Sequence, residues 1–220
     1  MITLTAEITL ANGEKITVNK RNMLSMDSKI IDRADINLPS WGIISNGGSI
    51  KIIDKIIDYV GIIKACIENY LINQDTKIEI FLQETLGGEN LKTKLGEFFA
   101  EKWSYDGDTN IATINFSDGL TKLQDIQITP IPKNVVSDVG GAINAYDLFI
   151  RFKQETEKNG FGFEGLNSDT TNHLKKFTFA FLYIEAKSLW TAWQQFCEAL
   201  QLHIYKNSNG KINCVYRGGD

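Results

Sequence analysis

Acidic residues in predicted loops are the side chains of this sequence that best suit acid–base chemistry. Glu84, Glu89, Asp106 and Asp108 stand among loop residues and aromatic side chains. Glycoside hydrolysis needs two carboxylates, because one protonates the leaving group while the other activates water or attacks the sugar. Acidic residues in loops are far more often solvated surface charges. We therefore predict no catalytic pair, and a cell-wall hydrolase is the third of three functional hypotheses.

A calcium site is the next chemistry to consider. Asp106, Asp108 and Asn110 form a D-x-D-x-N run that is similar to the start of a calcium-binding loop. An EF-hand loop would continue with glycine and end on a bidentate glutamate. Ile111 stands where the glycine is needed, and no glutamate follows in residues 112–117. The run therefore predicts a hairpin turn and no metal site.

The histidines and cysteines are not spaced for metal binding or nucleophilic catalysis. His173 and His203 belong to no HxxxH, HxH or HExxH arrangement. Cys66, Cys197 and Cys214 form no CxxC pair, and an odd number of cysteines does not indicate a disulfide framework. There is also no GxSxG motif. We predict no catalytic, cofactor-binding or metal-binding residue, and we expect the protein not to be an enzyme.

Two further patterns could bind a ligand. The Asn-Gly-Gly-Ser run at residues 46–49 could cradle a phosphate, but no Lys-Ser or Lys-Thr follows it and its flanks look like strands. Tryptophans could form a platform for a carbohydrate or a protein. Each lies in a strongly apolar pattern, which favours core packing: Trp41, Trp103, Trp190 and Trp193. A carbohydrate- or receptor-binding module is the second functional hypothesis.

The charge balance disfavours nucleic acid as a partner. The net charge is −4 and the sequence pI about 5.3, so the molecule as a whole repels a phosphate backbone. The most apolar stretch, residues 52–72, is interrupted by five charged residues, among them Asp54 and Lys64. Charges at such positions oppose insertion into a bilayer. We expect neither sequence-specific nucleic-acid binding nor membrane insertion.

The first half of the chain has the pattern of a β-domain. Residues 2–10 and 15–18 are strand-like on either side of Asn12-Gly13, which is typical of a hairpin. A second hairpin is predicted from residues 98–105 and 111–116. Further strands are expected over residues 36–53, bent at glycines, and 77–81. Residues 54–70 fit either one amphipathic helix or two strands joined at Gly61.

The second half has a mixed pattern. Two of the three prolines fall in residues 127–133, so a domain boundary is expected there, giving domains 1–128 and 129–220. Just before it, Ser117-Asp118 is expected to cap a short helical segment that runs to Leu123. After it, the pattern predicts a helix from Ser137 or Asp138 to residue 157 and a strand over residues 177–183. A second helix is predicted over residues 188–200, and a closing hairpin from the strands 203–206 and 211–216. The predicted class is α+β.

Several of these segments resemble one family. LPSWGIISNGGSI, WSYDGD and FSDGLTKLQ, at residues 38–50, 103–108 and 116–124, resemble the N-terminal part of tail hub proteins of long-tailed bacteriophages and prophages. So do SLWTAWQQFCE at residues 188–198 and the hairpin that begins at His203. The resemblance covers most of the chain, and it rests on turn and packing motifs.

The resemblance implies a viral structural protein of the baseplate hub. It implies a tail-tube-like β-barrel in residues 1–128, followed by a smaller α/β domain with two helices and a C-terminal hairpin. The expected assembly is a homotrimeric ring that closes the tail tube. The expected partners are the distal tail protein, the tape-measure protein and a tail fibre or receptor-binding protein. The protein would be made in the host bacterial cytoplasm and reside at the virion tail tip. Hub proteins are usually longer, so a fragment or a compact hub subunit is expected.

Overall fold

The structure is a computed structural model in which residues 2–29, 42–54, 56–57, 60–86, 89–128, 143–179 and 188–216 are described. The chain forms two compact units. The first contains residues of Met1–Asp32, Ser45–Gly119 and Ser208–Gly210, and the second contains those of Arg33–Ile44, Leu120–Asn207 and Lys211–Asp220. Among the described residues the chain therefore changes unit after Ile44, Gly119, Asn207 and Gly210, whereas the sequence predicts one boundary after residue 128. The difference arises because Leu120 and Leu123 are fully buried in the core of the second unit.

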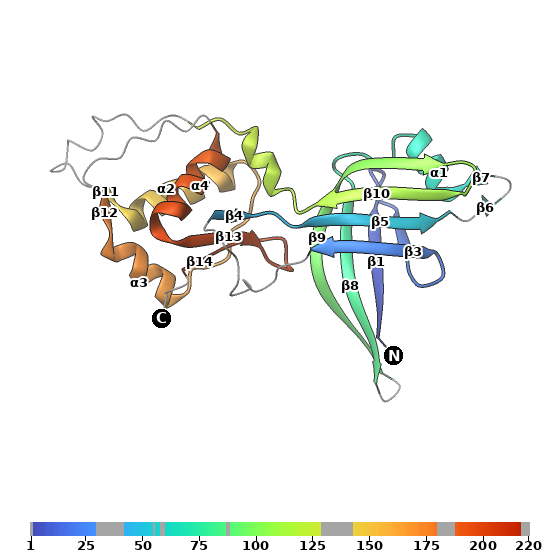
Figure 1. Ribbon diagram of the computed structural model, residues 1–220, viewed down its shortest axis with the longest axis horizontal. Helices are drawn as coiled ribbons and strands as arrows, with labels where there is room; N and C mark the ends of the chain where they lie inside the picture. Colours follow the sequence, from blue (N-terminus) through green and yellow to red (C-terminus); the bar gives the residue numbers. More distant parts are fainter. Residues whose placement is uncertain are drawn as a thin grey trace. The chain divides into compact units, whose positions relative to one another are not determined.

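The first unit is built on one antiparallel sheet of seven strands (Figure 1). Its strand order is β2-β1-β8-β9-β10-β5-β3. The strands are β1 (Ile2–Thr9), β2 (Lys15–Val18), β3 (Met23–Lys29), β5 (Gly47–Ile53), β8 (Lys77–Leu86), β9 (Glu89–Asp106) and β10 (Ile111–Ser117). The two predicted hairpins, β1–β2 and β9–β10, are confirmed. At the first turn Gly13 has a φ of 86°, a left-handed conformation that glycine adopts without strain.

The core of the first unit lies on one face of this sheet. Side chains at alternate positions are fully buried, such as Ala6 and Ile8 on β1 and Ile78 and Ile80 on β8. All seven strands contribute to this single core cluster, so the sheet must curve strongly around it. The sheet nevertheless has two edges, β2 and β3. The closed β-barrel that the resemblance implies is therefore not observed, and the fold is an open, curved sheet.

The segment that follows β5 combines the two predicted alternatives. The short strands β6 (Ile56–Ile57) and β7 (Val60–Gly61) pair, and the helix α1 (Ile62–Glu68) begins directly after Gly61. The buried carboxylate of Asp54 accepts hydrogen bonds from the amides of Ile63 at 2.8 Å and Lys64 at 2.9 Å. It thereby satisfies the first free amides of the helix. The prediction of one uninterrupted helix over residues 54–70 is wrong, because the Asp54 carboxylate binds the amides of residues 63 and 64 and the helix therefore begins only at Ile62.

The second unit has helices around a small sheet. Strand β13 (Leu202–Lys206) pairs antiparallel with β14 (Ile212–Tyr216) and parallel with β4 (Gly42–Ile44). The helices are η1 (Leu120–Gln124, a 3-10 helix), α2 (Ala145–Lys158), α3 (Ser168–Lys176) and α4 (Leu189–Leu200), and two short strands pair as β11 (Ile143–Asn144) and β12 (Thr178–Phe179). The mixed α+β class is thus confirmed, as are the closing hairpin and the helix after Ser188.

The start of one predicted helix in the second half differs from the structure. Helix α2 begins at Ala145 because the Asn144 side chain accepts a hydrogen bond from the Tyr146 amide. Ser137 and Asp138, the predicted caps, lie outside the described residues. The short helix η1 is present where it was predicted; the Ser117 hydroxyl accepts a hydrogen bond from the Gly119 amide just before it, and the Asp118 carboxylate accepts from Ser45 and Asn46.

Helix α3 was not predicted, and the strand predicted over residues 177–183 is described only at β12. In α3 only Thr170, His173 and Leu174 are buried. A helix with so few apolar residues has almost no hydrophobic periodicity to detect.

Candidate functional site

Of the acidic residues singled out in the sequence, Glu84 lies near one end of strand β9, whereas Asp106 and Asp108 lie at its other end. Glu84 is opposite Leu91 near the start of β9, whereas Asp106 is the last residue of that strand. At about 3.3 Å per residue, the stretch from Leu91 to Asp106 measures on the order of 50 Å along the strand. Paired glycosidase carboxylates lie roughly 5 to 10 Å apart. The side chain of Glu89 is outside the described part of the chain.

The D-x-D-x-N run is a hydrogen-bonded turn between β9 and β10. One carboxylate oxygen of Asp106 accepts from the Thr109 hydroxyl at 2.7 Å, and the other accepts from the Asp108 amide at 3.0 Å. These hydrogen bonds lower the pKa of Asp106. The Tyr105 hydroxyl donates to Asn110 at 2.9 Å. Within the described residues no group of three or more His, Cys, Asp or Glu side chains could hold a metal ion.

The histidines and cysteines are buried. The Nε2 atom of His173 is 2.8 Å from the Leu200 carbonyl oxygen, and its ring stacks on Tyr216. His203 is buried in strand β13. Burial raises the pKa of the Cys66 thiol, and it raises the pKa of the fully enclosed Cys197 and Cys214 thiols more strongly. Thiols in such surroundings are poor nucleophiles, because the reactive thiolate is disfavoured.

Where they are described, the two patterns that were weighed as ligand sites belong to a strand and to the cores, as the sequence favours. Trp193 is fully buried, and its ring nitrogen donates to the Thr156 hydroxyl at 2.9 Å. Trp103 and Trp190 are half-buried against the two cores, and Trp41 lies outside the described residues. The run at residues 46–49 enters strand β5, where Gly47 and Gly48 pair with β10. It is therefore a strand and not a phosphate loop.

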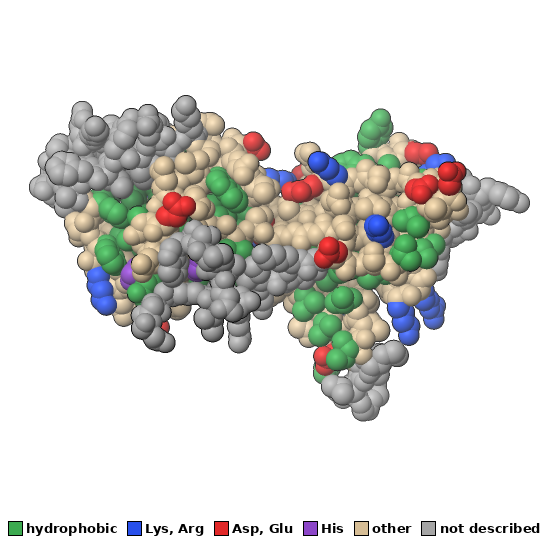
Figure 2. Space-filling view, in the orientation of Figure 1, with side chains coloured by type: hydrophobic (Ala, Val, Ile, Leu, Met, Phe, Trp, Pro, Cys, Tyr) green, Lys and Arg blue, Asp and Glu red, His purple; other side chains and the backbone are tan. Residues whose placement is uncertain are grey.

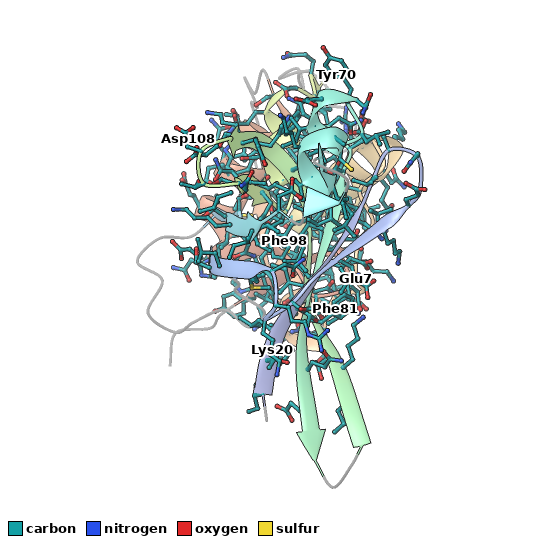
Figure 3. All side chains as sticks on the ribbon, turned by 90° about the vertical axis from the view of Figure 1, so that its right-hand side faces the viewer. Glu7, Lys20, Tyr70, Phe81, Phe98 and Asp108 are labelled. Atoms are coloured by element: carbon teal, nitrogen blue, oxygen red, sulfur yellow. The ribbon has the colours of Figure 1, made fainter. Side chains whose placement is uncertain are left out.

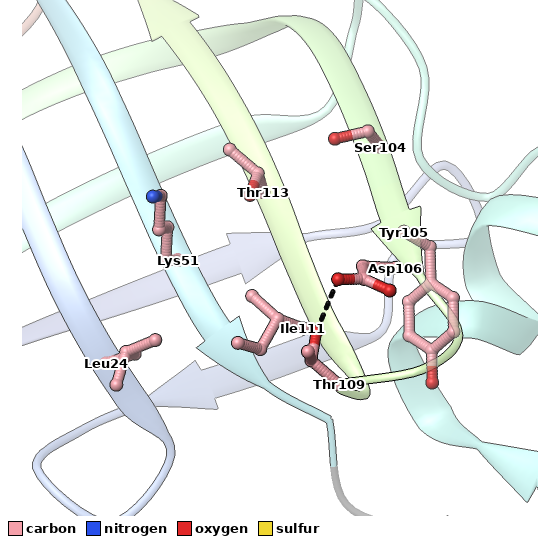
Figure 4. A pocket seen from close by; sticks show the side chains of 8 residues that line it. All are labelled: Leu24, Lys51, Ser104, Tyr105, Asp106, Thr109, Ile111 and Thr113. Atoms are coloured by element: carbon pink, nitrogen blue, oxygen red, sulfur yellow. Dashed lines mark hydrogen bonds between the residues drawn. The ribbon is translucent and has the colours of Figure 1, made fainter.

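One hollow of about 430 Å³ lies mainly on the outer face of the sheet, away from the core (Figure 4). It is lined by Leu24, Lys51, Ser104, Tyr105, Asp106, Thr109, Ile111 and Thr113. Leu24 is the extra residue of a β-bulge, since the β3–β5 register shifts between Met23 and Ser25. A bulge redirects side chains locally, and Leu24 is 52% exposed. We call Leu24, Lys51, Ile53 and Ile111 the outer patch.

A second surface is a β-arm, formed by residues 2–5 of β1, 81–86 of β8 and 89–95 of β9. In Figure 1 strands β8 and β9 extend beyond the other strands of the sheet, with the start of β1 beside them. Strand β2 pairs with β1 only from Ala6 to Thr9, and β10 pairs with β9 only from Phe99 onward. The arm therefore has strand edges without a paired neighbour among the described residues.

One face of the β-arm is apolar and exposed. Ile2 and Leu4 lie at two-residue steps from Ala6 and Ile8, so they face the same side of the sheet as the core. Ile2 is nevertheless 66% exposed, Leu4 40% and Leu91 50%. Glu84 lies between Ile2 and Leu91 in the strand register. The space-filling view displays hydrophobic side chains on the arm with an acidic one close to its grey tip (Figure 2).

Ion pairs cover the opposite face at the base of the arm, and Glu7, which belongs to them, is labelled in Figure 3. Glu7 pairs with Lys92 and Lys15, and Lys94 pairs with Glu79 at 2.7 Å and Glu97 at 2.9 Å. The hydrogen bond from Lys92 is the largest cause of the lowered pKa of Glu7.

The arm was missed in the sequence. The alternation Ile2-Thr-Leu-Thr is the same as that of a half-buried strand, so the exposure of its apolar side chains leaves no trace in the pattern.

No family model matches the sequence, and no curated protein matches it. The fold of the chain is similar to that of a prophage tail protein of known structure. That structure is the 43 kDa tail protein of prophage MuSo2 from Shewanella oneidensis, with a TM-score of 0.55 and 11% identity. The match covers 98% of this chain and 56% of that chain, so the chain spans just over half the length of this tail protein.

None of the described helices has both the length and the apolar character that a membrane span requires.

Proposed function

We propose that the protein is a structural component of a bacteriophage-type tail. More closely, we propose a baseplate hub subunit at the tail tip, which closes the tail tube and anchors distal tail and fibre proteins. The observation that carries this proposal is the shared fold: a prophage tail protein matches 98% of the chain. At 11% identity the likeness concerns the fold, and the role follows from it as a hypothesis.

The surfaces of the first unit support a role in assembly. Among the described residues its sheet ends at the edges β2 and β3, and the β-arm adds two edges without a described neighbour and an apolar face. Exposed strand edges and apolar patches are the features through which chains join one another. Asp106 and Asp108, two of the acidic residues considered for catalysis, belong to the hydrogen-bonded turn between β9 and β10. We accordingly propose a scaffold and not an enzyme.

The proposed partners follow from the same role. The chain would assemble with copies of itself, as a homotrimer, and with the distal tail, tape-measure and fibre or receptor-binding proteins. Ring assembly requires two different surfaces on each subunit when neighbours meet head to tail. The protein would be made in the bacterial cytoplasm and be incorporated at the virion tail tip.

Electron microscopy of particles tests the proposal. A short peptide tag is added to the chain in a phage or prophage that encodes it, and particles are labelled with gold-coupled antibody. We expect label at the tail tip and not on the capsid. Deletion of the gene should give particles without a completed tail, and a wild-type copy supplied in trans should restore it.

The proposal fails if complete, infectious tails form without the protein. It also fails if purified tails contain none of the tagged chain while the tagged protein is present in the cell. Label along the tail shaft would retain the coarser role of tail protein and reject the hub.

A further inference from the structure

We propose that the apolar face of the β-arm in one copy of the chain docks on the outer patch of a second copy. This inference rests on the proposed structural role and names the contact by which copies join. It concerns two surfaces of the first unit that the fold leaves exposed.

The β-arm supplies the first surface. Its apolar face continues the core face of the sheet beyond the point where the core ends, as the exposed side chains of Ile2, Leu4 and Leu91 indicate. No described element of the chain covers these side chains. The other face of the arm base already pairs its charges internally, through Glu7, Lys92 and their neighbours. A partner is therefore needed on the apolar face only.

The outer patch supplies the second surface. Leu24 is 52% exposed and Ile53 45% exposed, and Ile53 is opposite Ile111 in the strand register. The hollow of about 430 Å³ beside Leu24 and Ile111 can receive a side chain from a partner. Lys51 lies at its edge and is exposed to solvent (Figure 4).

Charge and chemistry match between the two surfaces. Each combines apolar side chains with one charged residue, and the charges are opposite: Glu84 on the arm and Lys51 on the patch. Among the described residues neither of these two enters an ion pair. Asp106 also lines the hollow, but its carboxylate oxygens are engaged by Thr109 and the Asp108 amide. Lys51 is thus the charge in the patch that is available to a carboxylate.

The geometry of the sheet points to a second copy. The arm presents the core face of the sheet, and the outer patch presents the opposite face. One sheet cannot fold its core face onto its own outer face without losing the core, so the two surfaces cannot meet within one unit. Two copies can join them, and because the surfaces differ, the contact is head to tail. Such contacts close into rings when the rotation between subunits permits.

The size of the surfaces sets the strength of the contact. A stable interface buries about 800 Å² on each partner, and three exposed aliphatic side chains provide only part of that area. The remainder would come from the unpaired edges of the arm. We therefore expect copies to associate in a way that depends on protein concentration. Removal of the Glu84–Lys51 charge pair should weaken this association measurably.

A charge exchange tests this contact on the full chain. The variants are Lys51→Glu, Glu84→Lys and the double variant, and sedimentation velocity measures the oligomer over a wide range of concentration. We expect each single variant to weaken association about tenfold, because like charges then face one another. The double variant should return to within about threefold of the wild type. Lys176→Glu, an exposed change in the second unit, is the matched control and should have no effect.

A second pair of variants tests the apolar part. Leu24→Ser and Leu91→Ser should each weaken association, and the double variant should be little worse than either single one, since residues in contact are not additive. Circular dichroism and thermal unfolding establish that each variant is folded.

Three results would overturn the inference. They are a wild-type chain that stays monomeric at all concentrations, association that no variant alters, and association weakened by the arm variants alone. The last result would mean that the arm binds another surface or another tail protein. The proposed function is tested independently of this contact. If it is wrong, the tagged chain will be absent from purified tails, whether or not purified copies of the chain associate.

Discussion

Replacing Asp118 with alanine is expected to destabilise the first unit more than any change in its turns. The Asp118 side chain is buried, with 1% exposure. Its carboxylate accepts from the Ser45 hydroxyl at 2.9 Å and from the Asn46 amide at 2.7 Å, and the Asp118 amide donates to the Asn46 carbonyl at 2.8 Å. These bonds hold the end of β10 to the segment that leads into β5.

The magnitude follows from the two lost hydrogen bonds. A hydrogen bond to a charged group contributes about 1.5 to 3 kcal/mol, and a buried donor left without a partner costs about 1 to 3 kcal/mol. Since Asn46 is itself buried, its amide has no access to water as a replacement. We expect Asp118→Ala to lower the free energy of unfolding by about 3 kcal/mol. Asp118→Asn keeps an oxygen acceptor and should cost about half as much.

Urea unfolding of the full chain, followed by circular dichroism, measures this change. The matched control is Asp108→Ala, an exposed turn residue that should alter the free energy by less than about 0.5 kcal/mol. Because the chain has two units, two transitions are expected, and the change should fall on the transition of the sheet. A loss below about 1 kcal/mol in Asp118→Ala would refute the role given to this carboxylate.

Three further outcomes are expected. Trp193→Phe should lower the free energy of unfolding by about 2 kcal/mol, because it leaves a cavity and removes the bond to Thr156; Trp190→Phe, at a half-buried site, should cost clearly less in the same urea titration. The lowered pKa of Glu7 means that its ion pairs stabilise the folded state above the ordinary carboxyl pKa of 4.5 and lose that contribution as the pH falls through the folded-state pKa. Glu7→Gln should therefore unfold with a weaker dependence on pH below 4.5, and an unchanged dependence would argue against the pairing. The three buried cysteines should resist a thiol reagent in the folded chain and react fully in guanidinium; rapid reaction of any of them under native conditions would contradict their burial.

Local patterns determined much of the first unit from sequence. The β1–β2 hairpin follows from strand-like residues on both sides of Asn12-Gly13, and the β9–β10 hairpin from two such runs around a polar turn. Helix α4 follows from the cap at Ser188 and the apolar positions that recur after it. In each case the information lies within a few residues of the element, because turn geometry and side-chain periodicity are local properties.

Elements whose stability comes from distant residues were not determined in this way. Helix α3 has few apolar positions and forms where its buried side chains contact the second core. Helix α1 starts where the carboxylate of Asp54 meets its first amides. The Asp118 carboxylate accepts hydrogen bonds from Ser45 and Asn46, 73 and 72 residues away, and no local pattern indicates these contacts.

The candidate interaction surfaces divide in the same way. Alternation in residues 2–8 determines which side chains share a face of strand β1, because successive residues of a strand point to opposite sides. Whether that face is covered depends on where the neighbouring strands end. Only the tertiary structure decided that β2 stops opposite Ala6 and β10 opposite Phe99. The side chains of Ala6 and Ile8 are buried for this reason, and those of Ile2 and Leu4 remain exposed.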